Sequence, residues 1–157
     1  MRPKLSRSLN EFAKINVSVS EVGKKIGGKV DYNINKLTKQ QGRFENACAI
    51  RMSYALNNSG LKIPHIPSHT VSGKNGNWYI YKVKSLIQYL TKVWGKPDIT
   101  ISQASAGQLS GFKGVLVFDV EGWSDASGHA TIWDGAACSD KCYFTQSKRV
   151  YGWKLEN

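Results

Sequence analysis

The stretch of sequence that decides the fold is residues 42–57, GRFENACAIRMSYALN. It predicts an α-helix that opens beside Cys48, because Asn46 is a favoured N-cap residue whose side-chain oxygen accepts a hydrogen bond from a free backbone N–H. The positive end of the helix dipole favours an anion at this end, so we expect an increased share of reactive thiolate at Cys48. The alternative is a buried structural thiol, since Ile50 and Leu56 indicate a helix that faces the core.

Length and composition predict a single domain, residues 1–157, with its own core. A hydrophobic content of 41% over 157 residues is ordinary for a folded protein of this size. The net charge of +11 favours an anionic partner such as nucleic acid, acidic lipid or a bacterial cell-wall polymer. Because the basic residues are scattered along the chain, a solvated basic surface is favoured over a nucleic-acid site.

The order of the expected elements, helices first and strands last, indicates the α+β class. Residues 29–41 read as a polar lead-in to the cysteine helix, and residues 61–77 as a long irregular excursion. The helices expected from apolar spacing and capping residues are one from Leu5 to about Asn16, one capped by Ser20 and ended by Gly27-Gly28, the cysteine helix ending at Asn58-Ser59-Gly60, and one from Lys82 to Trp94.

The C-terminal part of the chain predicts an antiparallel sheet. Residues 114–120, GVLVFDV, read as a buried central strand, and residues 129–135 as its antiparallel partner. Residues 149–155 alternate as in a last or edge strand, and Ile99 and Ile101 alternate with polar neighbours.

Three side chains far apart in the sequence are candidates for thiol acyl transfer. That chemistry needs a nucleophile, a base that moves its proton, and a group that orients the base. Cys48 supplies the thiol, His129 begins a predicted strand, and Asp140 lies in the turn-rich segment that follows this strand. The alternative is a structural strand-end histidine and a solvated loop carboxylate.

The alternation of side chains along the strand selects among the nearby carboxylates. The period of two places His129 and Thr131 on one face and Asp134 on the other. Asp140 is therefore expected to fold back toward the imidazole, with Asp125 as the alternative.

The remaining histidines and cysteines suggest other sites. His65 and His69 lack an acidic or cysteine partner nearby in the sequence, so exposed loop histidines are favoured over metal ligands. Cys138 and Cys142 lie four residues apart and form a disulfide if the chain works in an oxidising space; reduced thiols or a metal site are the alternatives.

Two segments resemble a known family. Residues 46–53, NACAIRMS, together with residues 127–134, SGHATIWD, resemble the papain-like, NlpC-type murein amidases, most closely the fourth family of type VI secretion amidase effectors. The resemblance extends from Gly27 through Cys142. It implies a papain-like cysteine peptidase fold, with N-terminal helices packed on a C-terminal antiparallel sheet. It also implies a DL-endopeptidase that cuts the γ-D-glutamyl to meso-diaminopimelate bond of peptidoglycan stems without a cofactor or metal.

The resemblance assigns roles by position. Cys48 corresponds to the nucleophile, His129 to the general base and acid, and Asp140 to the orienting carboxylate. For the oxyanion hole, the backbone N–H of Cys48 is the expected first donor, and the side chain of Gln40 or Gln41 is a candidate second donor.

The same resemblance implies delivery and partners. A type VI secretion tube protein would carry the toxin, peptidoglycan in the periplasm of a rival bacterium would be its substrate, and a cognate immunity protein would inhibit it at home. Residues 1–30 contain no apolar core of a signal peptide, which agrees with export by another route, and no apolar run of about 18 residues predicts a membrane span. In an oxidising periplasm, the Cys138–Cys142 disulfide would hold Asp140 against His129.

The residues alone leave two other functions open. A papain-like protease or acyltransferase acting on proteins would use the same three side chains. A basic protein that binds cell wall or nucleic acid without catalysis would carry an unreactive Cys48.

Overall fold

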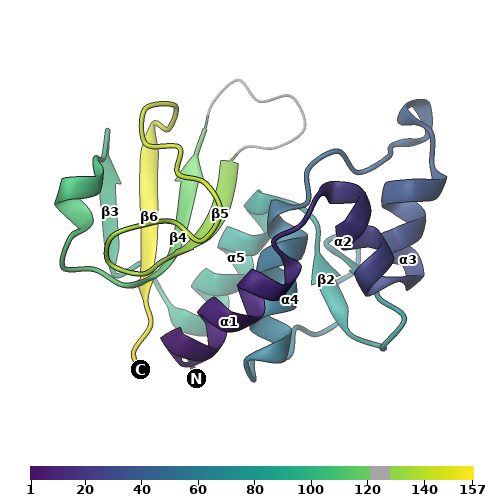
Figure 1. Ribbon diagram of the computed structural model, residues 1–157, viewed down its shortest axis with the longest axis horizontal. Coiled ribbons are helices and arrows are strands. Elements are labelled where there is room, and N and C mark those ends of the chain that lie inside the picture. The colour runs from purple at the N-terminus through teal and green to yellow at the C-terminus, as the bar shows by residue number, and fades with distance from the viewer. Residues whose placement is uncertain (121–127) are drawn as a thin grey trace.

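The computed structural model describes residues 1–120 and 128–157, so Asp125, the alternative carboxylate, lies outside the described residues. The α-helices and a four-stranded sheet occupy opposite sides of the molecule (Figure 1). Helices α1 (Leu5–Ile15), α4 (Cys48–Asn58) and α5 (Val83–Trp94) contact the sheet at strand β5 (Gly128–Trp133). The predicted α+β class is confirmed.

The N-terminal part of the chain is helical, as predicted, apart from a short hairpin. No helix in the described ranges is long and apolar enough to cross a membrane. The helices are α1 (Leu5–Ile15), α2 (Val19–Ile26), α3 (Gly28–Asp31), the π-helical η1 (Tyr32–Lys36), the 3-10 helix η2 (Lys39–Gln41), α4 (Cys48–Asn58), α5 (Val83–Trp94) and the 3-10 helix η3 (Ala106–Leu109).

Two helix predictions need correction. Helix α2 is capped by Ser18, whose hydroxyl accepts from the N–H of Glu21, while the predicted cap Ser20 donates to the side chain of Asn35 instead. The polar lead-in, residues 29–41, contains α3, η1 and η2. These short turns lack the apolar period that reveals a longer helix, so the sequence pattern missed them.

The sheet is antiparallel throughout, with strand order β3-β6-β4-β5. The predicted central strand is confirmed, since β4 lies between β6 and β5. Its strands are β3 (Ile99–Ser102), β4 (Gly114–Asp119), β5 (Gly128–Trp133) and β6 (Arg149–Lys154).

Two strand predictions were wrong in part. Strand β6 is not an edge strand, because it pairs with both β3 and β4. The region predicted to be irregular, residues 61–77, contains strand β1 (Thr70–Ser72), which pairs with β2 (Trp78–Ile80). A hairpin of three-residue strands is too short for alternation to be recognised in the sequence.

Helix α4 is buried along most of its length because it packs between α1 on one side and β2 and β5 on the other. Its buried polar side chains join it to the hairpin. The hydroxyl of Ser53 accepts from the N–H of Ile80 at 2.9 Å, and the amide of Asn57 donates to the carbonyl of Trp78 at 2.8 Å. These bonds fix the rotation of α4, and therefore the direction in which its first residue points.

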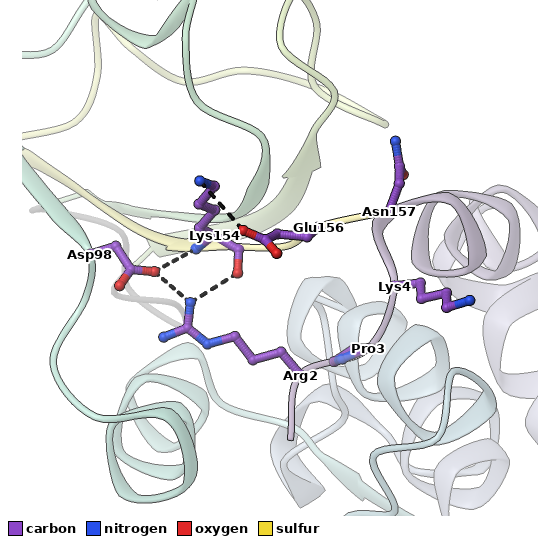
Figure 2. Close-up of a pocket in the computed structure, with 7 residues that line it drawn as sticks. All are labelled: Arg2, Pro3, Lys4, Asp98, Lys154, Glu156 and Asn157. Atoms are coloured by element: carbon purple, nitrogen blue, oxygen red, sulfur yellow. Dashed lines mark hydrogen bonds and ion pairs between the residues drawn. The ribbon is translucent and has the colours of Figure 1, made fainter.

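The two ends of the chain are joined around Arg2, in a hollow of about 460 Å³ that none of the candidate site residues lines (Figure 2). The Arg2 guanidinium donates to the Asp98 carboxylate, to the carbonyl of Lys154 at 2.9 Å and to the carbonyl of Trp94 at 3.2 Å. The same carboxylate accepts from the N–H of Lys154 at 2.7 Å. One arginine therefore links the N-terminal segment to the end of α5, to the residue just before β3 and to the end of β6.

We expect Arg2→Ala to lower the free energy of unfolding by about 1 kcal/mol, the upper range for a partly exposed ion pair, because three contacts are lost together. Urea unfolding followed by circular dichroism measures the change. Arg7→Ala is the matched control, since Arg7 is exposed, and it should change stability by less than about 0.5 kcal/mol. Equal effects of the two substitutions would contradict the linking role of Arg2.

Candidate active site

Cys48 is the first residue of α4. Its backbone N–H donates to Oδ1 of Asn46 at 2.8 Å, which confirms that the Asn46 side chain satisfies a free N–H at this helix start. Because the helix begins at Cys48, Ala47 and not the predicted Asn46 occupies the N-cap position. The thiol is buried, with 1% of the residue exposed, and its Sγ lies 3.8 Å from the carbonyl oxygen of Gly128 at the start of β5.

His129 is the second residue of β5 and is also buried. Its ring packs against Tyr143, with 4.7 Å between ring centroids, and against Phe118 of the neighbouring strand β4. The side chains of His129 and Cys48 interact by a hydrogen bond. Two predicted site residues, 81 positions apart in sequence, are therefore in contact.

Asp140 completes the group. Its Oδ2 lies 2.9 Å from Nε2 of His129, and both side chains are mostly buried. The contact is close enough for an ion pair, but the ring N–H is not aligned along it as in a regular hydrogen bond. The other carboxylate oxygen, Oδ1, accepts from the backbone N–H of Lys141 at 2.6 Å. The carboxylate is thus held by its own loop and by the imidazole.

The contacts and charges among these three side chains shift the pKa values of His129 and Asp140. Burial lowers the pKa of His129, but the hydrogen bonds and charges of Asp140 and Cys48 outweigh burial and raise the pKa to about 9. Burial raises the pKa of Asp140, but the hydrogen bond and charge of His129 outweigh it and lower the pKa. At neutral pH the site therefore holds an imidazolium beside a carboxylate.

The segment that carries Asp140 runs along the free edge of β5. Cys138 pairs with Trp133 as an isolated bridge, and the N–H of Ser139 donates to the carbonyl of Ile132 at 2.9 Å. A disulfide joins Cys138 to Cys142, on either side of Asp140. The predicted disulfide is present in the structure, and it closes the loop that contains the carboxylate.

Asp134 does not join the site, as the alternation of side chains predicted. Its Oδ1 accepts from the backbone N–H groups of Ala136 and Ala137, at 2.8 and 2.7 Å, and so stabilises the turn after β5. These bonds lower the pKa of Asp134.

Of the expected oxyanion donors, the backbone N–H of Cys48 already has an acceptor within the protein, the side chain of Asn46. The side-chain oxygen of Gln41 accepts from the N–H of Thr38, which fixes this side chain on the turn of η2, and Gln40 is exposed. A substrate oxygen at the Cys48 N–H would therefore compete with the side chain of Asn46.

A hollow of about 280 Å³ is formed by residues 42–46, just before the cysteine in the sequence, with Tyr81 and Lys82. The ring of Phe44 stacks on that of Tyr81, with centroids 4.8 Å apart. Asn46 lines this hollow and also accepts from the N–H of Cys48, so one side chain connects the hollow to the start of α4.

His65 and His69 line a separate hollow of about 600 Å³. His65 is exposed and stacks on Trp78, whereas Nδ1 of His69 lies 2.6 Å from the hydroxyl of Ser85. Within residues 1–120 and 128–157, no group of three histidine, cysteine, aspartate or glutamate side chains is gathered to hold a metal ion. His69 is thus engaged by a hydroxyl, which the sequence did not predict.

The family model of type VI secretion system (T6SS) amidase effector protein 4, Tae4, matches residues 44–153, the part of the chain that contains all three candidate site residues. The chain belongs to the Tae4 family. The prediction of the family from residues 46–53 and 127–134 is therefore confirmed. A comparison with curated protein sequences finds no match.

Solved Tae4 structures are similar over nearly the whole chain. The Tae4 of the Tae4-Tai4 effector-immunity complex from Enterobacter cloacae is 39% identical, with a TM-score of 0.89 over 99% of this chain and 100% of that chain. The corresponding complex from Salmonella Typhimurium gives 40% identity and a TM-score of 0.88, over 99% of each chain. Tae4 of E. cloacae by itself gives 40% and 0.88, over 99% of this chain and 98% of that chain. The papain-like α+β fold that the Tae4 resemblance implied is confirmed.

The raised pKa of His129 predicts that stability falls as the pH rises. In the unfolded chain the imidazole has its ordinary pKa near 6.5, so its contribution is fully present below this pH and is lost as the pH rises through about 9. The ring signals of His129 in an NMR titration measure the folded pKa, and urea unfolding between pH 6 and 9.5 measures the loss.

Asp140→Asn is the matched comparison for this titration, because it removes the carboxylate charge but keeps the shape. The pKa of His129 should fall in this variant, and the decrease of stability with pH should become shallower. An unchanged His129 titration would contradict the assignment of Asp140 as the charge beside the ring.

Proposed function

We propose that this Tae4 family member is a cysteine amidase that hydrolyses the γ-D-glutamyl to meso-diaminopimelate bond in peptidoglycan stem peptides. Cys48 is the nucleophile, His129 the general base and acid, and Asp140 the carboxylate that orients the imidazole. The family supplies the coarser activity, that of a type VI secretion amidase effector that attacks peptidoglycan. The thiol mechanism and the bond are the proposal.

A single observation carries the mechanism, namely that thiol, imidazole and carboxylate meet in that order in a buried site. His129 lies between Cys48 and Asp140, with the carboxylate 2.9 Å from Nε2. Because the imidazole keeps its proton up to a pH of about 9, it stabilises a thiolate at Cys48 by charge.

In the first half-reaction, the thiolate sulfur attacks the γ-carbonyl carbon of the D-glutamyl residue and forms a tetrahedral oxyanion. The carbon–nitrogen bond then breaks, and imidazolium gives its proton to the leaving amine of diaminopimelate. The D-glutamyl group remains bound to Cys48 as a thioester. The high pKa of His129 suits this step, since an amine leaves only after it has been protonated.

In the second half-reaction, water replaces the amine. The neutral imidazole takes a proton from the water, whose oxygen attacks the thioester carbon, and the thiolate leaves. The products are a free γ-carboxylate on D-glutamate and a free amino group on diaminopimelate. Asp140 remains ionised throughout and stabilises the imidazolium each time it forms.

The surroundings of the thiol suit a peptide of the cell wall. The hollow formed by residues 42–46, Tyr81 and Lys82 is lined by the segment just before Cys48. It offers two aromatic rings and Lys82 to a stem peptide rich in carboxylates, while Arg43 is paired with Glu45. A net charge of +11 favours association with an anionic polymer. Both features support peptidoglycan over neutral substrates.

We further propose that residues 1–157 act as one domain and that the chain has a cognate immunity protein. The partner is supported by its relatives, whose structures include Tae4-Tai4 effector-immunity complexes. Delivery by a type VI secretion tube protein, and action in the periplasm of the target cell, complete the proposal. The N-terminal segment bonds to the end of β6 through Arg2, which supports a single unit.

Cys48→Ala and His129→Ala should each lower hydrolysis of purified sacculi by at least about 10³-fold, as removal of a nucleophile or its base does in other hydrolases. Asp140→Asn should lose less, on the order of 10- to 1000-fold, because the amide still orients the ring but cannot stabilise imidazolium by charge. Mass spectrometry of the released fragments identifies the bond that is cut.

Circular dichroism and unfolding midpoints are the controls that these variants keep their fold, and a casein digest tests the alternative protein substrate. Turnover by Cys48→Ala at the wild-type rate would contradict the proposed mechanism. Cleavage at another bond of the stem would leave the mechanism in place but overturn the proposed specificity.

The disulfide gives a separate proposal about position. Closing a loop of five residues contributes about 2 kcal/mol by chain entropy alone. Since Asp140 lies inside this loop, we propose that the Cys138–Cys142 bond mainly keeps the carboxylate against His129. Its loss should then lower turnover more than it lowers stability.

The double variant Cys138→Ser, Cys142→Ser should retain its fold, unfold at a slightly lower urea concentration and hydrolyse sacculi about tenfold more slowly, because the carboxylate is held less firmly. The matched measurement is the wild type with and without a reductant. Full activity of the double variant would refute the positioning role of the disulfide.

A further inference from the structure

Thr131 lies on the same face of β5 as His129, two residues further along the strand. It is fully buried, with 0% of the residue exposed. Its hydroxyl oxygen is shielded from water and has no well-aligned hydrogen bond among the residues that the structure describes. A buried hydroxyl without a partner costs on the order of 1–3 kcal/mol, so its presence beside the site calls for an acceptor.

The register at the edge of β5 brings Asp140 opposite Thr131. Cys138 pairs with Trp133, and the N–H of Ser139 bonds to the carbonyl of Ile132, so the segment runs antiparallel to the strand. Extending this register by one residue beyond Ile132 and Ser139 places Asp140 opposite Thr131. Residues opposite each other in an antiparallel pair project their side chains to the same side of the sheet. Their Cα atoms are closest in pairs that no backbone hydrogen bonds join, such as Trp133 and Cys138.

The carboxylate has room for another donor. Its Oδ1 accepts from the N–H of Lys141 and its Oδ2 approaches His129, but an ionised carboxylate offers about four acceptor positions. The interaction with the Thr131 hydroxyl also contributes to the lowered pKa of Asp140. Because the His129 ring N–H is poorly aligned with Asp140, that contact alone does not fix the carboxylate.

We propose that Thr131 is a positioning residue of the site: its hydroxyl donates to the Asp140 carboxylate and holds it against Nε2 of His129. The inference rests on the proposed function for the roles of His129 and Asp140. Thr131 itself touches neither substrate nor thiol in this scheme, and it acts only through the carboxylate. Strand β5 thus supplies both His129 and Thr131, the side chain that holds Asp140 beside it.

Thr131→Val tests the proposal, because valine keeps the volume and the strand preference but lacks the hydroxyl. We expect kcat to fall about tenfold with KM unchanged, the loss of roughly one hydrogen bond in the transition state. The NMR titration of His129 should shift to lower pH, since the carboxylate is no longer held beside the ring. Thr131→Ser, which retains the hydroxyl, should restore kcat to within about threefold of the wild type.

A double-mutant cycle separates positioning from packing. In the Asp140→Asn background, Thr131→Val should lower kcat little further, since its partner charge is already gone. Thr131→Ala is a second hydroxyl-free variant and should give the same His129 shift. Thr100→Val, at an exposed threonine of strand β3, is the matched control and should leave kcat and the titration unchanged.

Unchanged turnover and an unchanged His129 titration in folded Thr131→Val would overturn the proposal, as would full additivity with Asp140→Asn. Neither result would affect the proposed function, which fails only if Cys48→Ala remains active or another bond is cut. The titration needs no substrate, so it tests the role of Thr131 even if the peptidoglycan assignment is wrong.

Discussion

The site depends on the packing of the first turn of α4 against the first residues of β5. Cys48 and His129 are 81 positions apart, and they meet only because the buried helix is held at a fixed rotation against the sheet and the β1–β2 hairpin. Sγ of Cys48 touches the carbonyl of Gly128 directly. A residue larger than glycine at position 128 would collide with the carbonyl of Phe118, so the close approach of strand to strand at this point requires glycine.

Besides this packing, the site depends on the electrostatic environment of His129. A buried imidazole would ordinarily lose its proton, because burial disfavours the charged form. Here Asp140 and Cys48 reverse that tendency and raise the pKa of His129 to about 9. The charged form is therefore maintained inside the protein by its neighbours, and these neighbours must be held in place. The disulfide closes the loop that contains this carboxylate, the backbone bonds of the loop lie along the edge of β5, and the Thr131 hydroxyl contributes to the lowered pKa of Asp140.

Much of the fold followed from the sequence where a long apolar period or a clear alternation existed. This was true of α1, α4, α5, β4 and β5, and alternation along β5 also separated Asp134 from Asp140. Short elements were missed, because three or four residues carry no period: α3, the β1–β2 hairpin and the turns of η1 and η2 are examples. The place of β6 was also missed, since the alternation along residues 149–155 is typical of an edge strand, although β6 lies between β3 and β4.

The sequence indicated the three candidate side chains and the return of Asp140 toward His129, but not the local contacts that hold them. Residue types and spacing indicated Cys48, His129 and Asp140, and the sequence also indicated that Asn46 accepts from a free N–H. Which N–H it meets depends on the local backbone path before α4. Thr131 was assigned to the correct face but received no role, because nothing in a strand pattern tells which buried hydroxyl will meet a carboxylate from a later loop.

The segment after β5 has a further consequence for how the molecule behaves in solution. Strand β5 ends the sheet, and an exposed sheet edge can recruit a strand from another chain. Here the carbonyl of Ile132 and the N–H of Asp134 are already bonded to Ser139 and Ala137. The loop that brings Asp140 to His129 therefore also occupies the backbone hydrogen-bonding groups at this part of the sheet edge. Loosening this loop would free these backbone groups for pairing with another chain, so the position of the carboxylate and the protection of the sheet edge depend on the same few backbone bonds.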